Sequence, residues 1–226
     1  KRERKIQEPL EICFNSENSD WEIGIDEAGR GPLFGRVYTA AVVLPKEASL
    51  FNHSLMKDSK KFTSKKKIEE AAEYIKENAI AYNVSYEDEN TIDNINILQA
   101  TFKSMHNSVK MILQNKPNET KIDKLLVDGN NFKPYLYFDN NHYNQLNHVC
   151  IEGGDNKYTC IAAASILAKV ERDKYIEQLC SKHPDIDEKY GILKNKGYGT
   201  RKHIDGIKTF GISPFHRKTY GICKNY

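Results

Sequence analysis

Acidic side chains stand at or near the ends of several apolar runs in this 226-residue sequence. Four of them follow segments that read as buried strands: Asp26, Glu27, Asp128 and Asp155. Carboxylates gathered closely repel one another, so a site built from them needs a bound cation or retained protons. Hard oxygen ligands of this kind favour Mg²⁺ or Mn²⁺ over zinc. Taken singly, each is equally a turn or helix-cap residue, so only their grouping predicts a metal site.

Other kinds of reactive site find little support in the sequence. The five cysteines are odd in number and form no CxxC pair, which argues against a disulfide framework or a zinc ribbon and indicates a reducing, cytoplasmic location. The seven histidines show neither HxH nor HExxH spacing. A phosphate-binding loop of the type GxxxxGK[ST] is also missing. The strand-end carboxylates therefore remain the main candidates.

Charge permits a polyanionic partner without requiring one. The net charge is +3 and the pI is near 8.4. Lysines cluster between Lys57 and Lys67, and a second basic stretch runs from Lys194 to His203. Charge alone fits a solvated surface equally well. The apolar run Ile161–Ala168 is too short to span a bilayer, and the basic start at Lys1 has no apolar stretch behind it, so we expect neither a membrane role nor a secretory signal.

Strand and helix signals alternate along the chain. The expected strands are Trp21–Ile25, Val37–Leu44, Ile80–Val84, Leu125–Val127 and Val149–Ile151, and the expected helices are one capped by Thr63 or Ser64, one through Ile95–Ile112 and one over about Lys157–Leu179. The first two strands read as a hairpin. This order predicts an α/β fold with a mixed sheet. We expect a flexible tail over 1–20, a catalytic domain over 21–182 and a helical extension over 183–226.

The segment Gly24-Ile25-Asp26-Glu27-Ala28-Gly29-Arg30-Gly31-Pro32 resembles the signature of ribonuclease HII. The resemblance covers roughly residues 22–220 and continues in order through Asp58-Ser59-Lys60-Lys61, Val127-Asp128-Gly129, Gly154-Asp155, Ile161–Val170 with Arg172-Asp173, Lys196-Gly197-Tyr198-Gly199-Thr200, and His216-Arg217. It implies a ribonuclease H-like mixed β-sheet flanked by helices, with a small C-terminal helical extension that assists substrate binding.

The same resemblance implies roles for individual residues. The metal-binding and catalytic carboxylates would be Asp26, Glu27, Asp128 and Asp155. The turn Gly29-Arg30-Gly31 would contact the ribose 2′-hydroxyl through backbone groups. Lys60 would approach a phosphate, and Tyr198 would pack against the sugar beside the RNA-to-DNA junction. Taken alone, Tyr198 also fits a half-buried aromatic with an exposed hydroxyl, and Lys60 fits a solvated lysine.

The function implied is endonucleolytic cleavage of RNA in RNA·DNA hybrids and nicking 5′ of ribonucleotides embedded in duplex DNA. Phosphodiester hydrolysis needs an activated water and a neutralised leaving oxygen, which two Mg²⁺ or Mn²⁺ ions supply together. The products would carry 5′-phosphate and 3′-hydroxyl ends. Distinguishing RNA from DNA requires contact with the 2′-hydroxyl. Glycine suits that contact because the backbone approaches the ribose without a Cβ in the way. We expect the protein to act as a monomer.

Several residues depart from the family pattern or need a different interpretation. Arg36, Tyr38 and Asn195 stand where bacterial relatives commonly have Pro, a small aliphatic residue and His. These departures concern the contour of the substrate groove and leave the carboxylates intact. Asp173 is interpreted as a helix-face partner for a basic residue, and His216-Arg217 as a pair that fixes the C-terminal segment.

Two alternatives stay open. Another nuclease of the same sheet class would also use clustered carboxylates, and fold alone does not separate it. Its discriminator is the Gly-Arg-Gly turn, which only an enzyme that reads ribose needs. A non-catalytic nucleic-acid-binding protein would be expected to lack at least one of the four carboxylates, and all four are present.

Overall fold

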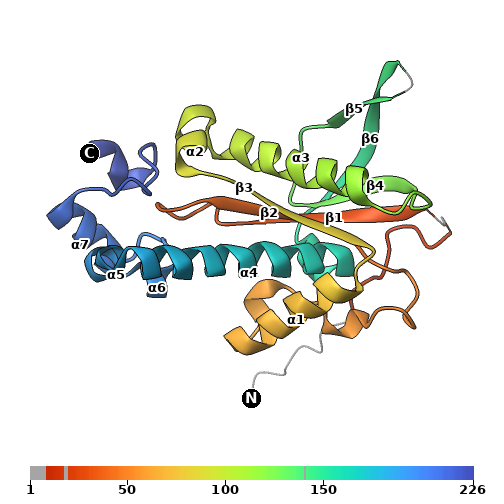
Figure 1. Cartoon of the computed structure of the whole chain (residues 1–226), viewed down its shortest axis with the longest axis horizontal. Helices are drawn as coiled ribbons and strands as arrows, with labels where there is room; N and C mark the ends of the chain where they lie inside the picture. The colour runs from red at the N-terminus through yellow and green to blue at the C-terminus, as the bar shows by residue number, and fades with distance from the viewer. Residues whose placement is uncertain (1–8, 18–19, 140) are drawn as a thin grey trace.

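A six-stranded mixed sheet forms the middle layer of the protein in the computed structural model, which describes residues 9–17, 20–139 and 141–226 (Figure 1). In spatial order its strands are β3 (Ala81–Glu87), β2 (Val37–Val43), β1 (Trp21–Ala28), β4 (Ile122–Asp128), β6 (His142–Ile151) and β5 (Tyr135–Asp139). Strand β4 runs parallel to both β1 and β6, while β2, β3 and β5 are antiparallel to their neighbours. The expected hairpin is β1–β2, and the mixed sheet is confirmed.

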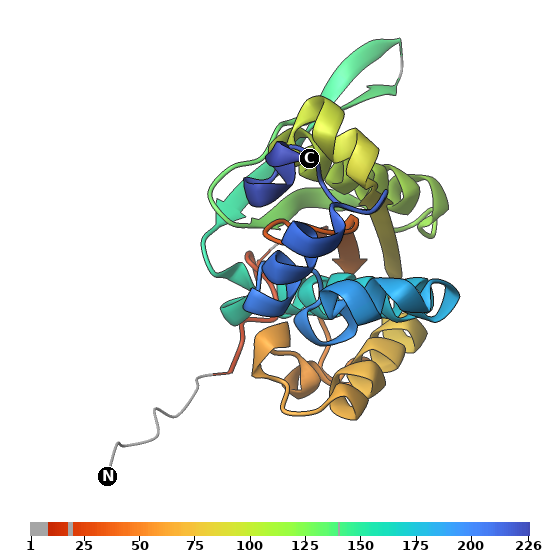
Figure 2. The ribbon, with the colours of Figure 1, turned by 90° about the vertical axis from the view of Figure 1, so that its left-hand side faces the viewer.

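Helices cover both faces of this sheet (Figure 1). One face carries α2 (Glu89–Ile95) and α3 (Ile97–Asn115), and the other carries α4 (Thr159–Lys182) with α1 (Lys65–Asn78) packed outside it. Figure 2 looks onto the end of the sheet where the helical extension gathers, formed by α5 (Pro184–Tyr190), α6 (Ile192–Asn195) and α7 (Arg201–Phe210). Short 3-10 helices lie at His53–Leu55, Ser59–Lys61, Gly154–Asn156 and Gly221–Asn225. The layered architecture predicted from the sequence is therefore present.

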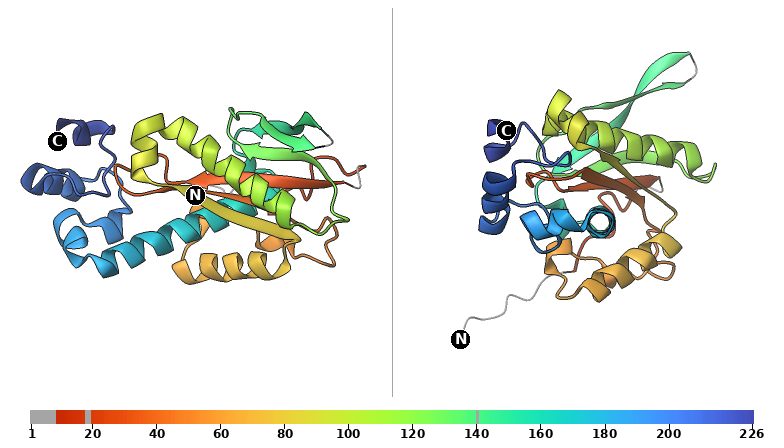
Figure 3. Two further views of the ribbon diagram at one scale, coloured as in Figure 1. Left: turned by 45° about the horizontal axis from the view of Figure 1, so that its top comes forward. Right: turned by 60° about the vertical axis from the view of Figure 1, so that its left-hand side comes forward.

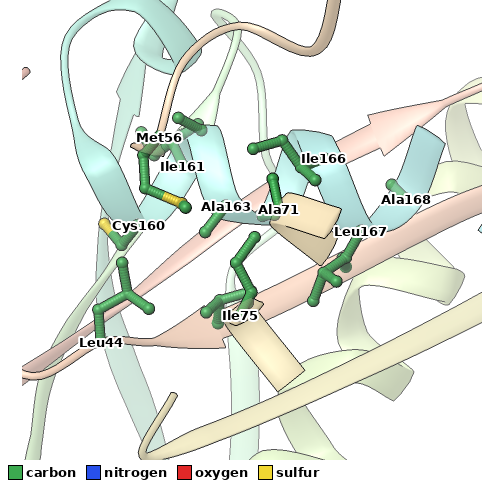
Figure 4. Close-up of a cluster of buried hydrophobic side chains, with 14 of the residues drawn as sticks. Leu44, Met56, Ala71, Ile75, Cys160, Ile161, Ala163, Ile166, Leu167 and Ala168 are labelled. Atoms are coloured by element: carbon green, nitrogen blue, oxygen red, sulfur yellow. The ribbon is translucent and has the colours of Figure 1, made fainter. Parts of the chain in front are cut away.

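Helix α4 is the central element of the core. Most of its apolar side chains are buried in the cluster that it forms with the sheet and α1, and Figure 4 shows Ile161, Ile166 and Leu167 of α4 together with Ile75 of α1 in this cluster. A Cβ added at Gly24 would lie 2.2 Å from the carbonyl carbon of Cys160. Glycine at this position therefore lets the start of α4 approach the backbone of β1, which fixes the helix against the strand that carries the first two carboxylates.

The extension is joined to the rest of the fold by its own apolar cluster. Phe34, from the segment after β1, packs in it together with Ile176 near the end of α4 and with Tyr190, Ile192 and Ile207 of the extension. All five side chains are at most 3% exposed. Burial of this kind makes the placement of the extension dependent on the segment that follows the first strand.

One of the two other expected helices agrees with the structure, and the other is divided into two. The side chain of Ser64 accepts a hydrogen bond from the backbone N–H of Lys67, so Ser64 is the N-cap of α1. The helix expected through Ile95–Ile112 is split, because Asn96 adopts a φ of 65° and its side chain caps α3 by accepting from Gln99 N. The apolar spacing continues across the break, so periodicity alone gives no sign of it.

A hairpin of β5 and β6 extends away from the body of the protein (Figure 3). The sequence analysis recognised only the final part of β6, Val149–Ile151. The outer part exposes Leu136, Phe138 and Tyr143, which are 57%, 63% and 76% exposed. Because neither face of this part is buried, the hydrophobic pattern that usually marks a strand does not point to it.

The N-terminal region contains both described and undescribed residues. The basic start, Lys1–Lys5, lies outside the described residues, as do residues 6–8 and 18–19. Glu11 forms a bridge with Tyr158, and the backbone N–H of Phe14 donates to Glu22. Across the described parts of the chain, no helix has the length and apolar character needed to cross a bilayer. The division at residues 20 and 182 stays a prediction.

Candidate active site

Asp26 and Asp128 lie side by side where β1 and β4 end. The two strands are parallel with Ile25 opposite Val127, so the next residue of each reaches the same edge of the sheet. Asp26 is 5% exposed, and its Oδ1 accepts a hydrogen bond of 2.6 Å from the backbone N–H of Glu27. Glu27 accepts from the Arg30 guanidinium at 3.2 Å. The three carboxylates expected from these strands therefore converge at one edge.

The fourth carboxylate reaches the same region from the turn between β6 and α4. The backbone N–H of Gly154 donates to Oδ1 of Asp128 at 2.7 Å, which brings this turn against β4. A Cβ at Gly154 would lie 2.6 Å from Ile161 Cδ1, so a larger residue here would require the Ile161 side chain to move. Asp155 follows directly and is 5% exposed. The structure thus places all four predicted carboxylates together.

Burial and nearby like charges disfavour the ionised forms of Asp26, Glu27 and Asp155. Burial, and then the charges of Glu27 and Asp128, hold the pKa of Asp26 well above its ordinary value. Burial also raises the pKa of Glu27, although the Arg30 charge opposes the shift. Burial and the neighbouring aspartates raise the pKa of Asp155. A cluster in which like charges are held at close range is suited to receive a cation.

Lys60 is the basic side chain that faces this cluster from the 3-10 turn Ser59–Lys61. The Asp58 carboxylate caps that turn by accepting from the backbone N–H of Lys60 at 2.9 Å. Burial alone would lower the pKa of Lys60, but the surrounding carboxylates outweigh it and raise the pKa: Asp58, Asp155, Asp26 and Asp128. Lys60 therefore carries its charge beside the candidate site, where a phosphate could also reach it.

Asp58 is a further acidic member of the site to which the sequence analysis assigned no role. The side chain of Asn156 donates to Oδ1 of Asp155 at 2.9 Å and to Oδ2 of Asp58 at 3.3 Å. Asp58 stands in the motif that contains Lys60, so the sequence held a signal for it. Its position beside Asp155 depends on contact between segments 98 residues apart, which the motif does not reveal.

The turn Gly29-Arg30-Gly31 forms one wall of the site. Gly29 has a φ of +94°, a conformation that favours glycine, and a Cβ there would lie 2.2 Å from Nε of Arg172. A Cβ at Gly31 would lie 3.4 Å from Cε1 of Tyr198. Arg172, which had no assigned role, thus packs against Gly29, the ring of Tyr198 lies beside Gly31, and both side chains line the site.

These groups surround a hollow of about 270 Å³. Its lining includes the turn Gly29–Gly31 together with Asp26, Glu27, Lys60, Asp128, Ser165, Lys169 and Tyr198. Asp155 is not among the lining residues, although it is close enough to Asp128 for their charges to interact. The ring of Tyr198 is 52% exposed, so a flat aromatic surface stands beside the carboxylates. The arrangement can hold a charged, sugar-containing ligand between the carboxylates and the Tyr198 ring.

The donor set matches a magnesium or manganese ion in its chemistry. Within the described residues, no three acidic, His or Cys side chains already converge into a coordination shell. Magnesium commonly binds through one or two carboxylates and completes its shell with water and substrate phosphate. An open cluster of raised-pKa carboxylates beside a phosphate-sized hollow fits that mode of binding. Asp26, Glu27, Asp128 and Asp155 are the residues that could hold such ions.

A buried histidine pair lies beneath Tyr198. Nδ1 of His203 is 2.9 Å from the carbonyl oxygen of Tyr198, so this nitrogen carries a hydrogen and donates it. The bare Nε2 of His203 then accepts from Nε2 of His216 at 2.9 Å. Nδ1 of His216 in turn accepts from the backbone N–H of Ser213 at 2.9 Å. The chain of bonds is satisfied when both rings are neutral, and it ties the Tyr198 backbone to the C-terminal segment.

Other residues singled out in the sequence make local contacts of their own. Lys169 donates to both carboxylate oxygens of Asp173 at 2.7 Å, which confirms the expected helix-face pair. The Arg36 guanidinium lies 4.0 Å from the centroid of the Tyr86 ring. Asn195 accepts from the backbone N–H of Gly197 at 2.8 Å. Arg36 and Asn195, which depart from the family pattern, therefore each make a local contact with neighbouring residues.

Comparisons with known proteins agree with this architecture. A family model described as ribonuclease HII matches residues 23–223. Ribonuclease HII of Cytophaga hutchinsonii is 43% identical over 209 residues, which cover 92% of this chain and 93% of the relative. Ribonuclease HII of Endomicrobium trichonymphae is 45% identical, covering 87% and 83%. The crystal structure of ribonuclease H2 from Pyrococcus horikoshii has a TM-score of 0.68 at 23% identity, covering 91% of this chain and 96% of that one, a likeness of fold.

Proposed function

Because the chain belongs to the ribonuclease HII family, we propose that it nicks duplex DNA on the 5′ side of embedded ribonucleotides. Membership of this family makes the chain a hydrolytic endoribonuclease acting on RNA·DNA hybrids. The finer activity is the cleavage of a strand that contains a single ribose. It requires a site that aligns one phosphate with the carboxylates and inspects the sugar next to it.

One observation supports this proposal most directly. The Gly29–Gly31 turn, the Tyr198 ring and the carboxylates of Asp26 and Asp128 line the same hollow. A ribose bound against the turn would therefore have its phosphate beside the carboxylates. A nuclease that recognises only the shape of a duplex has no need for a glycine turn at this place, since shape is read along the backbone.

Hydrolysis here adds water to phosphorus and breaks the bond to the 3′-oxygen, which leaves 5′-phosphate and 3′-hydroxyl ends. Asp26, Glu27, Asp128 and Asp155 would hold two Mg²⁺ or Mn²⁺ ions, which when bound supply Lewis-acid activation of water and neutralise the leaving oxygen.

The remaining steps belong to the chain's own groups. Lys60 binds a phosphate oxygen and so holds the backbone of the nucleic acid in place, without reading its sequence. Backbone groups of Gly29, Arg30 and Gly31 contact the 2′-hydroxyl. The Tyr198 ring packs on the next sugar, where an added hydroxyl would crowd it, so deoxyribose is preferred at that position.

Tyr198 is the residue that the predicted C-terminal extension contributes to the hollow. Residues 21–182 supply the carboxylates, and residues 183–226 supply the aromatic edge of the hollow, so the extension assists substrate binding. The partners would be RNA·DNA hybrids and duplex DNA that contains ribonucleotides. The monomeric state and the cytoplasmic location stay predictions, and size-exclusion chromatography with light scattering tests the first.

The activity is tested by single-turnover cleavage of matched duplexes that carry no ribonucleotide, one, or four in a row, in Mg²⁺ and in Mn²⁺. We expect one nick, 5′ of the single ribonucleotide, with a 3′-hydroxyl end that a polymerase can extend. Cleavage of the run of four without cleavage at the single ribonucleotide would refute junction reading. Binding without cleavage of any duplex would favour the non-catalytic alternative.

Tyr198→Ala separates alignment from affinity. The ring aligns the sugar with the carboxylates and adds little to total binding, so we expect the single-turnover rate to fall more than the affinity does. Tyr143→Ala is the matched control, because Tyr143 is 76% exposed on the β5–β6 hairpin. Equal losses of rate and affinity in Tyr198→Ala would contradict the assignment.

A further inference from the structure

Arg217 lies completely buried directly behind the Gly29–Gly31 turn. Its exposed fraction is 0%, and burying a cation is unfavourable unless each N–H group finds an acceptor. Burial lowers its pKa to about 10, so the side chain still carries its charge at neutral pH. Such a residue is kept in place by specific bonds, and four hydrogen bonds that its guanidinium donates lead to one segment of the chain.

Four carbonyl oxygens between residues 29 and 35 receive the N–H groups of Arg217. Nη2 donates to Gly29 O at 2.6 Å, and Nε donates to Gly35 O at 2.8 Å. Nη1 donates to Pro32 O at 2.9 Å and to Arg30 O at 3.0 Å. A planar guanidinium with this fork of donors therefore fixes the whole turn, whereas a lysine would reach fewer of the four oxygens.

The direction of these carbonyls determines the direction of the neighbouring N–H groups. In a planar trans peptide the C=O and N–H bonds point to opposite sides, and the described residues contain no cis peptide bond. Gly29 O faces Arg217, so the N–H of Arg30 faces away from it. Arg30 O also faces Arg217, so the N–H of Gly31 faces away too. Both residues line the hollow, which lies on the side that Arg217 does not occupy.

Tyr220 adds a second contact from the same C-terminal segment. Its hydroxyl donates to Arg30 O at 3.0 Å, and its ring lies 5.1 Å from the Arg217 guanidinium. The carbonyl of Arg30 is thus held by two side chains at once.

We infer that Arg217, assisted by Tyr220, is a positioning residue that turns the Arg30 and Gly31 N–H groups toward the ribose. This inference rests on the proposed function, in which the turn reads the 2′-hydroxyl. It assigns substrate discrimination partly to two side chains, Arg217 and Tyr220, that are not among the residues lining the hollow. The interpretation of His216-Arg217 from the sequence, as a pair that fixes the C-terminal segment, is thereby extended to the turn.

The test compares three variants of the full chain with Mg²⁺ present. Arg217→Lys keeps the charge and loses most of the fork. Tyr220→Phe keeps the ring and loses one hydroxyl. Tyr190→Phe is the matched control, because the buried Tyr190 hydroxyl donates to Gly211 O at 3.1 Å, a carbonyl outside the turn. Two quantities are measured: kcat on a duplex with one ribonucleotide, and the Kd for the matched all-DNA duplex, which has no cleavable ribonucleotide.

A loss of alignment lowers kcat and leaves the Kd for the all-DNA duplex unchanged, whereas general loss of structure affects both. We expect kcat to fall about 10- to 100-fold in Arg217→Lys, since small misplacements of a reacting group have effects of that size. Tyr220→Phe should lose about 2- to 10-fold, the contribution of one hydrogen bond. Tyr190→Phe should stay within about twofold of the wild type, because its lost bond does not involve the turn.

Wild-type kcat in both folded variants at the turn would overturn the inference while leaving the proposed function in place. If Arg217→Lys shows no cooperative unfolding transition, Tyr220→Phe decides alone, and an unchanged kcat in that variant again overturns it. Failure of the wild-type protein to nick the single-ribonucleotide duplex refutes the proposed function, and the inference fails with it.

Discussion

Lowering the pH from 7 to 5 places a proton on His216 in the unfolded chain but not in the folded protein. Burial, and then the neighbouring His203, lower the pKa of the folded His216 ring to about 3, against an ordinary value of 6.5. Between pH 6.5 and about pH 3 the unfolded chain therefore binds more protons than the folded protein does. The contribution of the neutral His216 ring to the free energy of unfolding is therefore fully present above about pH 6.5 and is lost as the pH falls toward 3.

The magnitude follows from the size of this shift. Each pH unit below 6.5 removes about 1.4 kcal/mol per group, so His216 alone lowers the free energy of unfolding by about 2 kcal/mol at pH 5. Burial also lowers the pKa of His203, which acts in the same direction. The rings packed around His216 are those of Phe34, Tyr190 and His203, and none of these can stabilise an added positive charge by ion pairing.

The assay is urea denaturation at pH 7 and pH 5 for the wild type, for His216→Asn and for His183→Asn. Other groups titrate over this range, so the informative quantity is the pH-induced change in the wild type minus that in each variant. We expect a difference of about 2 kcal/mol for His216→Asn and almost none for His183→Asn, whose side chain is exposed. Equal pH dependence of all three proteins would refute the reasoning, as would an NMR titration of His216 with a midpoint near 6.5.

Three substitutions test the site, its binding surface and its support. Asp128→Asn should retain the fold and lose cleavage by orders of magnitude, and near-normal single-turnover cleavage would contradict the metal site. Lys60→Ala should weaken binding to all hybrids and flatten the salt dependence of binding, because fewer counterions are released. The control is Lys66→Ala, because the Lys66 side chain is 85% exposed. An unchanged salt slope in Lys60→Ala would mean that Lys60 is a solvated surface lysine that makes no phosphate contact. Gly24→Ala should lower the free energy of unfolding by about 3 kcal/mol in urea, since the added Cβ meets the α4 backbone, and a loss below about 1 kcal/mol would mean that the helix can shift.

The carboxylates of the cluster could be named because the family motifs contain them, and the placement of two of them also follows from local pattern. Asp26 and Asp128 each follow a short apolar strand, and parallel strands bring their ends to one edge of a sheet. The order of strands and helices likewise indicated the layered fold. These features depend on residues a few positions apart, which a single sequence displays directly.

Features that depend on distant contacts could not be predicted in the same way. The break at Asn96 leaves the apolar spacing of the helix intact, and the outer part of the β5–β6 hairpin has no buried face to mark it. Arg172 and Arg217 both stand in motifs of the family, and Arg217 was interpreted as fixing the C-terminal segment, but nothing near either residue in sequence indicates that it is buried against the Gly29–Gly31 turn. Their acceptors are carbonyl groups, which every residue possesses, so no side-chain pattern reveals the pairing.

Arg217 is 188 positions further along the chain than Gly29, and this separation has a consequence for the timing of synthesis. A ribosome adds about 5–20 residues per second, so roughly 10–40 s pass between the two residues. β4 is made about halfway through that interval, so for the rest of it β1 and β4 can pair while the turn still lacks its anchor. A nascent chain at this stage has the proposed ligands of the site but lacks the side chain that holds the turn, so we expect full activity only once translation has passed Arg217.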